Sequence, residues 1–197
     1  MRATNDGTIT PRSVALAAAV ALAAAAAAPL AAQEGGEGVS FNVRGGVNVP
    51  TFDIADAADP GPSFGVGLKV PVSERVFLRA SGDFGFHPGA ELETGRELPD
   101  VNVYHYVGGL GVRLTPSESR WYASVNAGAG AMTFDVEEVD SFTYFAVNVG
   151  GEVGYWVSDR VALFVSPQGD IAFSDEDELG TGDAWVWPFS AGVEIRP

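Results

Sequence analysis

From residue 39 onward, apolar and polar residues alternate along the chain with a period of two. In the first stretch, Phe41, Val43 and Val47 stand at odd positions, and Asn42 and Arg44 stand between them. A period of two places successive side chains on opposite faces of a β-strand. The pattern recurs in eight segments, at residues 39–49, 63–70, 76–86, 104–114, 121–127, 145–157, 161–173 and 185–196. The sequence therefore predicts an all-β chain of eight strands, each with one apolar face and one polar face.

The connections between these segments alternate in length. Those at residues 71–75, 115–119 and 158–160 are short, whereas those at 50–62, 87–100, 135–141 and 174–183 are long. Short turns at one end and longer loops at the other are typical of antiparallel strands that run up and down and close into a barrel. We therefore predict an eight-stranded antiparallel up-and-down β-barrel.

Two prolines, Pro167 and Pro188, lie inside predicted strands. Each removes one backbone donor from the sheet, and a closed barrel has no free edge where that loss is harmless. We expect each proline to mark a bulge, or else the strand ends elsewhere than the pattern indicates.

Alternation alone does not say which face of the barrel points inward. An eight-stranded barrel has an interior just wide enough for its own side chains, and the apolar face carries too many aromatic rings to fit there. The opposite face consists mostly of small residues, with many glycines such as Gly65, Gly67, Gly109 and Gly130. No position of the apolar face is charged, and a Lys or Arg at the bilayer midplane would cost roughly 2–4 kcal/mol. The apolar face is therefore expected to face lipid; a soluble barrel with an apolar interior is the alternative.

Aromatic residues of the apolar face gather near the ends of the predicted strands. Such rings suit the two headgroup levels of a bilayer. Ordinary β-propensity also enriches strands in aromatics, but it does not predict their position near the ends. The predicted aromatic girdle consists of Phe84, Phe86, Tyr104, Tyr106, Trp121, Phe145, Tyr155, Phe173, Trp185 and Trp187.

The first 32 residues are typical of a cleavable secretory signal peptide. Arg2 and Arg12 give a positive start, an uncharged Ala-rich stretch follows at residues 14–30, and small residues precede Gln33. A membrane anchor is the alternative, but an Ala-rich stretch of this length is weakly apolar and short for a bilayer. We expect residues 1–32 to be removed and residues 33–197 to form the barrel domain.

These features resemble the small outer-membrane β-barrel family of the OmpA/OmpX type. The resemblance rests on the leader, the eight alternating segments, the glycine-rich tract at residues 106–113, and a Val-Ser-acidic-Arg turn that occurs at residues 72–75 and 157–160. It covers residues 38–197 and implies an outer-membrane location, with membrane lipid and the assembly machinery as partners. The chain departs from the family at its end, where Ile195, Arg196 and Pro197 stand in place of a terminal aromatic residue. It also offers no downstream peptidoglycan-binding segment.

The polar face of the predicted strands carries charges of both signs in near balance. The basic residues are Arg44, Lys69, Arg79, Arg113 and Arg196, and the acidic residues are Asp83, Glu152, Asp170 and Glu194. A narrow interior favours such balance, because a buried charge that loses its partner is strongly destabilising. We expect these residues to form a structural ion-pair network. A narrow ion path through the same charges is the alternative.

No catalytic, metal or cofactor site is predicted. If the third and fourth strands pair symmetrically, His105 lies near Asp83 with Ser81 two residues away, which is the composition of an acyl-transfer triad. Such contacts are common in polar interiors, and no other enzyme motif is present. The absence of cysteine excludes disulfides and thiolate metal sites.

The charge of the chain is strongly acidic, with 11 Lys and Arg against 26 Asp and Glu and a formal net charge of −15. This balance argues against nucleic acid as a partner, because phosphate binding requires clustered Lys and Arg.

Most of the surplus of acidic residues lies in the long loops, which we expect to be hydrated surface loops. Divalent cations at these loops are a further hypothesis, because carboxylate oxygens suit such ions; the stretch from Asp175 to Asp183, with Gly180, faintly resembles a calcium loop. The expected role is structural or surface interaction, with porin-like transport of small solutes as the alternative.

Overall fold

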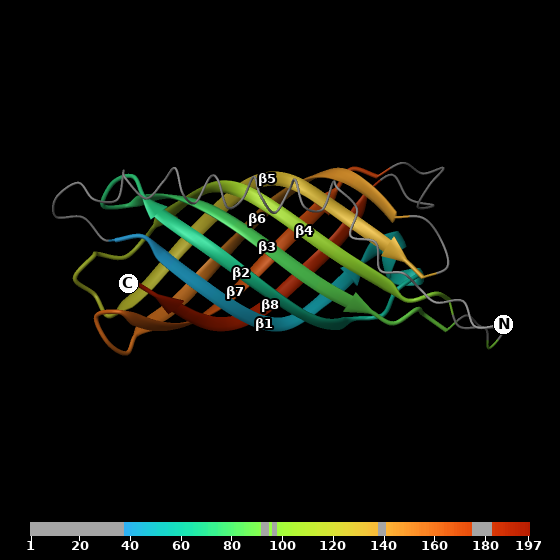
Figure 1. Cartoon of the computed structure of the whole chain (residues 1–197), viewed down its shortest axis with the longest axis horizontal. Helices are drawn as coiled ribbons and strands as arrows, with labels where there is room; N and C mark the ends of the chain where they lie inside the picture. The colour runs from blue at the N-terminus through green and yellow to red at the C-terminus, as the bar shows by residue number, and fades with distance from the viewer. Residues whose placement is uncertain (1–37, 92–94, 96–97, 138–140, 175–182) are drawn as a thin grey trace.

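The computed structural model contains one closed sheet of eight antiparallel strands (Figure 1). It describes residues 38–91, 95, 98–137, 141–174 and 183–197, so the expected leader at residues 1–32 lies outside the described residues. The strands are β1 (Ser40–Thr51), β2 (Gly61–Pro71), β3 (Val76–His87), β4 (Val101–Arg113), β5 (Trp121–Val136), β6 (Ser141–Trp156), β7 (Val161–Ala172) and β8 (Ala184–Ile195). Each pairs with the next along the chain, and β1 pairs with β8. The predicted eight-stranded up-and-down barrel is confirmed.

The pairing is staggered, so the strands are tilted against the barrel axis. The stagger can be followed by moving from partner to partner around the sheet. The path from Phe41 passes through Leu68, Ala80, Gly108, Ala129, Val147, Ile171 and Trp185 to Thr51. It returns to β1 at a residue ten positions after its start (41 to 51).

The two ends of the barrel differ. The connections β2–β3, β4–β5 and β6–β7 are short and lie together at what we call the turn end, where β1 begins and β8 finishes (Figure 1). The remaining connections lie at the opposite loop end. There a 3-10 helix, η2 (Phe52–Asp56), follows β1, and backbone hydrogen bonds join the loop after it to the β3–β4 loop, as between Asp59 N and Pro88 O at 2.9 Å. Within the described residues no helix is long and apolar enough to cross a membrane.

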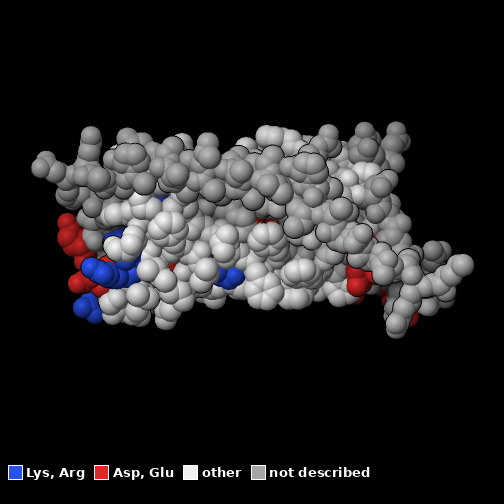
Figure 2. Space-filling model, in the orientation of Figure 1, with Lys and Arg blue, Asp and Glu red and all other residues white. Residues whose placement is uncertain are grey.

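The apolar face of the strands points away from the barrel axis. Phe64 and Phe145 are 60% and 58% exposed, whereas Asn148 and Asp170 are each 3% exposed. On the face that Figure 2 shows, Lys and Arg gather at the turn end, Asp and Glu lie at both ends, and few charged side chains lie on the wall between them. A soluble barrel with an apolar interior would show the reverse pattern. The predicted orientation of the two faces is therefore confirmed.

Pro167 and Pro188 lie inside β7 and β8, and neither marks a bulge or a strand end. The β6–β7 and β7–β8 registers are the same on both sides of the two prolines. Pro167 lies opposite Gly151, whose carbonyl accepts hydrogen bonds from Ser166 Oγ at 3.1 Å and Gln168 Nε2 at 3.2 Å. These side-chain donors stand in for the backbone donor that Pro167 lacks. Because the registers do not change at either proline, the expectation of a bulge was wrong.

Candidate functional site: the interior of the barrel

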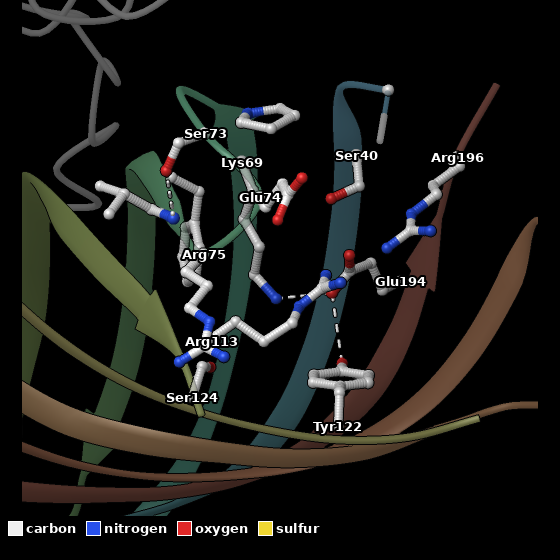
Figure 3. A pocket seen from close by; sticks show the side chains of 14 residues that line it. Ser40, Lys69, Ser73, Glu74, Arg75, Arg113, Tyr122, Ser124, Glu194 and Arg196 are labelled. Atoms are coloured by element: carbon white, nitrogen blue, oxygen red, sulfur yellow. Dashed lines mark hydrogen bonds and ion pairs between the residues drawn. The ribbon is translucent and has the colours of Figure 1, made fainter. Parts of the chain in front are cut away.

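A charged cluster lies inside the barrel near the turn end. Lys69 on β2 lies 2.5 Å from both Glu152 Oε1 on β6 and Glu194 Oε2 on β8. The Tyr122 hydroxyl on β5 donates to the same two carboxylates, at 2.8 and 3.2 Å. Figure 3 shows Lys69 and Tyr122 converging on Glu194 from opposite walls. The four side chains therefore connect four strands across the interior.

Aromatic rings surround the ammonium group of this cluster. Lys69 Nζ lies 5.7, 5.5 and 5.7 Å from the ring centroids of Phe77, Tyr122 and Phe164. The faces of aromatic rings attract cations, and the attraction strengthens where water is excluded. Tyr122, Phe164 and Trp156 also form a buried apolar cluster with Ala162. The Lys69 charge is thus balanced by two carboxylates and enclosed by rings.

Arg79 occupies the middle of the interior and is held by neutral side chains. Its guanidinium donates to Asn126 Oδ1, to Asn148 Oδ1 at 3.1 Å and to Gln168 Oε1 at 3.2 Å. It also donates to Ser81 Oγ at 3.2 Å. A planar group with five N–H donors can satisfy several acceptors at once. Arg79 therefore connects β3 to β5, β6 and β7.

Two further charged contacts lie nearby. Arg44 contacts Asp83 through two parallel bonds, Nε to Oδ1 at 2.8 Å and Nη2 to Oδ2 at 2.5 Å. His105 Nδ1 lies 2.9 Å from Asp170 Oδ2, and Asn148 donates to the other oxygen of the same carboxylate. Asn148 therefore links Arg79 to the His105–Asp170 pair.

The three residues of the candidate triad do not come together. His105 and Asp83 are opposite each other in the β3–β4 register, as symmetric pairing predicts. Their side chains nevertheless have other partners, because Asp83 binds Arg44 and His105 binds Asp170. Ser81 accepts from Arg79. The geometry thus offers no hydroxyl–imidazole–carboxylate relay at this position.

Apolar side chains of β4 to β8 pack together in the interior toward the loop end. Val103, Met132, Phe134 and Val186 are all less than 5% exposed and pack with three alanines in one cluster. Ile54 of η2 packs against this cluster from the loop side. We call these residues the apolar plug. Its presence corrects the expectation that the interior face consists mostly of small residues.

Glycines make room for the large interior side chains. A Cβ on Gly150 would lie 2.2 Å from Gln168 Oε1, and one on Gly65 would lie 2.1 Å from Asp83 Oδ1. Small cavities remain inside the described part of the barrel, among them one of about 30 Å³ beside Lys69 and Arg113 and one of about 20 Å³ beside Arg44 and Arg79. Each is large enough for only one or two water molecules.

The residues of the predicted aromatic girdle lie on the outer face, and most of them contact one another. Near the turn end, Trp121 and Tyr155 have ring centroids 5.0 Å apart. Toward the loop end the pairs are Phe84 with Tyr104 at 5.7 Å, Phe84 with Tyr106 at 6.4 Å, Phe145 with Phe173 at 5.9 Å and Trp185 with Trp187 at 6.4 Å. Phe86 is 44% exposed. Whether these rings mark the headgroup levels stays a prediction.

Sequence reasoning missed the aromatic residues inside the barrel. Trp121–Tyr122 and Tyr155–Trp156 are consecutive aromatic pairs, and alternation requires one ring of each pair to point inward. That signal was available for Tyr122 and Trp156. Phe77, Phe134 and Phe164 follow the same rule. Each lies an odd number of positions from the lipid-facing residues of its strand and therefore on the opposite, inward face.

The described acidic residues of the loop end form no group of three carboxylate, histidine or cysteine ligands that could hold a metal ion. Residues 175–182, which include most of the calcium-loop candidate, lie outside the described residues. Divalent cations at the loops therefore stay a hypothesis.

Comparison with known proteins places the chain in a family. The family described as outer membrane protein beta-barrel domain matches residues 14–196. The chain belongs to this family. No curated protein matches the sequence significantly. The barrel is therefore an outer-membrane protein, and its exposed apolar wall suits contact with lipid.

Several solved structures share the fold. Neisserial surface protein A is 15% identical, with a TM-score of 0.64 over 83% of this chain and 100% of that one. OprG from Pseudomonas aeruginosa is 12% identical, with a TM-score of 0.52 over 83% and 99%. The N-terminal β-barrel domain of OprF from the same organism is 11% identical, with a TM-score of 0.51 over 82% and 100%. At these identities the likeness supports the fold alone.

Proposed function

We propose that the protein is a non-conducting, non-enzymatic barrel of the outer membrane with a structural or surface-interaction role. The observation that carries the proposal is the cross-linking of the interior, where Lys69, Arg79 and Arg44 each contact side chains from other strands. An ion could pass only if several of these contacts broke together.

The apolar plug supports the same conclusion. An ion that leaves the charged middle of the barrel toward the loop end meets Met132, Phe134 and Val186. These side chains offer no oxygen or nitrogen to replace the water that the ion must shed, and the cost of stripping an ion in an apolar environment is large. On the side of β4 to β8 the polar interior thus ends at an apolar cluster before it reaches the loops, whereas Asn48, Ser63 and His87 line the side of β1 to β3.

The loop end supports a surface role. Its described part carries Asp53, Asp56, Asp59, Glu91, Asp100, Asp135, Glu137 and Asp183 and no Lys or Arg. A surface of one sign attracts partners of the opposite sign and stays hydrated. Titration calorimetry with calcium or magnesium at millimolar concentration tests cations as such partners, and an absence of both heat and thermal shift would remove them.

Conductance through a planar lipid bilayer tests the non-conducting barrel. We expect the purified folded protein to insert, as judged by protease protection, and to give no discrete conductance steps. Stable single-channel steps that appear with the folded protein but not with heat-denatured protein would overturn the proposal. They would favour the alternative, a narrow channel for small solutes.

A further inference from the structure

A cavity at the turn end has the chemistry of a headgroup site. It measures about 210 Å³ and lies at the rim of the barrel, between the β4–β5 turn and the β6–β7 turn. Its lining includes two guanidinium groups (Arg120 and Arg196), two carboxylates (Glu118 and Asp159) and the ring of Trp156. We propose that this cavity binds the headgroup of a zwitterionic phospholipid that carries a phosphate and a primary ammonium group.

The cavity is built from backbone contacts between turns. Trp156 N donates to the Arg120 carbonyl at 2.8 Å, which joins the β4–β5 turn to the end of β6. Arg196 N donates to the Arg160 carbonyl at 2.8 Å, which joins the chain after β8 to the β6–β7 turn. The Arg196 guanidinium lies 3.7 Å from the centroid of the Trp156 ring, and Trp156 is 8% exposed. The inner wall of the site is therefore held in place before a ligand arrives.

Hydroxyl groups add donors for a phosphate. Ser119 Oγ accepts from Trp121 N at 3.2 Å, and Ser158 Oγ accepts from Val161 N at 3.2 Å. A hydroxyl that accepts a backbone N–H keeps its own proton for donation. Both serines line the cavity together with the two guanidinium groups, and Arg matches phosphate with paired, charge-assisted bonds.

The carboxylates decide which headgroup is preferred. Two guanidinium groups and two carboxylates sum to no net charge, so a phosphate alone would face repulsion from Glu118 and Asp159. A primary ammonium attached to the phosphate can donate hydrogen bonds to those carboxylates. A quaternary ammonium has no N–H to donate, and a glycerol headgroup carries no positive charge. We therefore expect phosphatidylethanolamine to bind more tightly than phosphatidylcholine or phosphatidylglycerol.

The position of the cavity supports a membrane lipid as the source of this headgroup. The adjoining outer wall carries Leu114, Trp121 and Val157, which are 58%, 61% and 48% exposed. These residues offer an apolar surface for acyl chains directly beside the charged lining. Figure 2 shows basic and acidic side chains next to each other at this end of the molecule.

The test is a titration of the folded barrel in maltoside micelles with short-chain dihexanoyl phospholipids. The indole N–H resonance of Trp156 reports binding and is assigned with Trp156→Phe, while the resonances of Trp185 and Trp187 at the loop end serve as internal references. We expect dihexanoyl-phosphatidylethanolamine to shift the Trp156 resonance with saturation. The phosphatidylcholine and phosphatidylglycerol analogues should bind at least about tenfold more weakly.

Variants separate the proposed site from general lipid contact. Arg120→Gln is expected to weaken phosphatidylethanolamine binding about tenfold, and the double change Glu118→Gln and Asp159→Asn to abolish the preference over phosphatidylglycerol. Arg75→Gln is the matched control, because Arg75 follows an acidic residue in the β2–β3 turn but does not line this cavity; it should bind as the unchanged protein does. Heat-modifiable gel mobility checks that each variant is folded.

Three results would overturn the proposal: no saturable shift of Trp156, equal affinity for phosphatidylglycerol, or unchanged binding in folded Arg120→Gln. Soluble glycerophosphoethanolamine distinguishes the source of the ligand, since equal affinity for it would exclude a dependence on the membrane lipid. The proposal is independent of the conductance of the barrel, because the cavity lies at the rim and is not lined by Lys69, Arg79 or Arg44.

Discussion

The Lys69 ammonium and the Glu194 carboxylate lie 2.5 Å apart inside the barrel, although 125 residues separate them along the chain. The side chains of Lys69, Glu152 and Glu194 are only 15%, 7% and 4% exposed. Closure of the sheet through β1 and β8 therefore brings the cation of the second strand to a carboxylate of the last one. Loss of either partner would leave the other charge buried and uncompensated, so this contact contributes to the stability of the fold.

We predict that Lys69→Met destabilises the barrel by about 3–5 kcal/mol, because it leaves two carboxylates close together without a cation. The measurement is the free energy of unfolding by urea in lipid vesicles, followed by tryptophan fluorescence. Arg160→Gln, an exposed change in the β6–β7 turn, should alter stability by about 0.5 kcal/mol or less. Adding Glu194→Gln to Lys69→Met should recover part of the loss. Equal stabilities for Lys69→Met and Arg160→Gln would show that the cluster is not structural.

The second prediction concerns Arg79. Arg79→Ala removes the shared donor of Asn148, Gln168 and Asn126 and leaves their buried oxygens without it. Each unsatisfied buried group costs about 1–3 kcal/mol, so we expect a loss of at least about 3 kcal/mol in the same unfolding experiment. Arg79→Lys should recover only part of this loss, because an ammonium cannot reach acceptors spread around a planar fork. Unchanged stability in Arg79→Ala would contradict the structural interpretation of the interior charges.

Adjacent glycines on β1 provide a matched pair for the third prediction. A Cβ on Gly46 would lie 2.0 Å from the Phe189 carbonyl oxygen, whereas the nearest atom to a Cβ on Gly45 is 3.7 Å away. Because the Phe189 oxygen belongs to the backbone of β8, Gly46→Ala must shift the β1–β8 seam that closes the barrel. Overpacking of this kind costs about 1–3 kcal/mol, and Gly45→Ala should cost little. Comparable yields of folded protein and comparable unfolding midpoints for the two variants would count against this prediction.

The sequence predicts the side of the sheet on which a residue lies far better than the partner it finds across the barrel. Period-two alternation placed Asp83 and His105 correctly inside and opposite each other. It could not show that His105 reaches Asp170 on β7, because that contact crosses the interior and depends on the curvature of the closed sheet. Strand number and face orientation repeat along the chain, and cross-barrel contacts do not.

The same distinction explains the error about the interior. Counting glycines on the polar face suggested small side chains, but several of these glycines lie beside a larger side chain, as Gly154 lies beside Tyr122. The apolar plug was missed for a related reason. Met132 and Phe134 extend β5 beyond the segment in which alternation was recognised, and their partners Val103 and Val186 are distant in sequence.

The last prediction uses the apolar plug to separate a closed interior from a channel. Phe134 is a 1% exposed member of the cluster, and Phe134→Ala removes most of its side chain from the interior. We expect a loss of about 3–5 kcal/mol in stability, together with brief conductance events that the unchanged protein lacks. Phe145→Ala is the control, because Phe145 lies on the same end of the barrel but faces outward and is 58% exposed. If folded Phe134→Ala remains as silent as Phe145→Ala, the barrier to ions lies in the cross-linked charges around Arg79 and not in the plug.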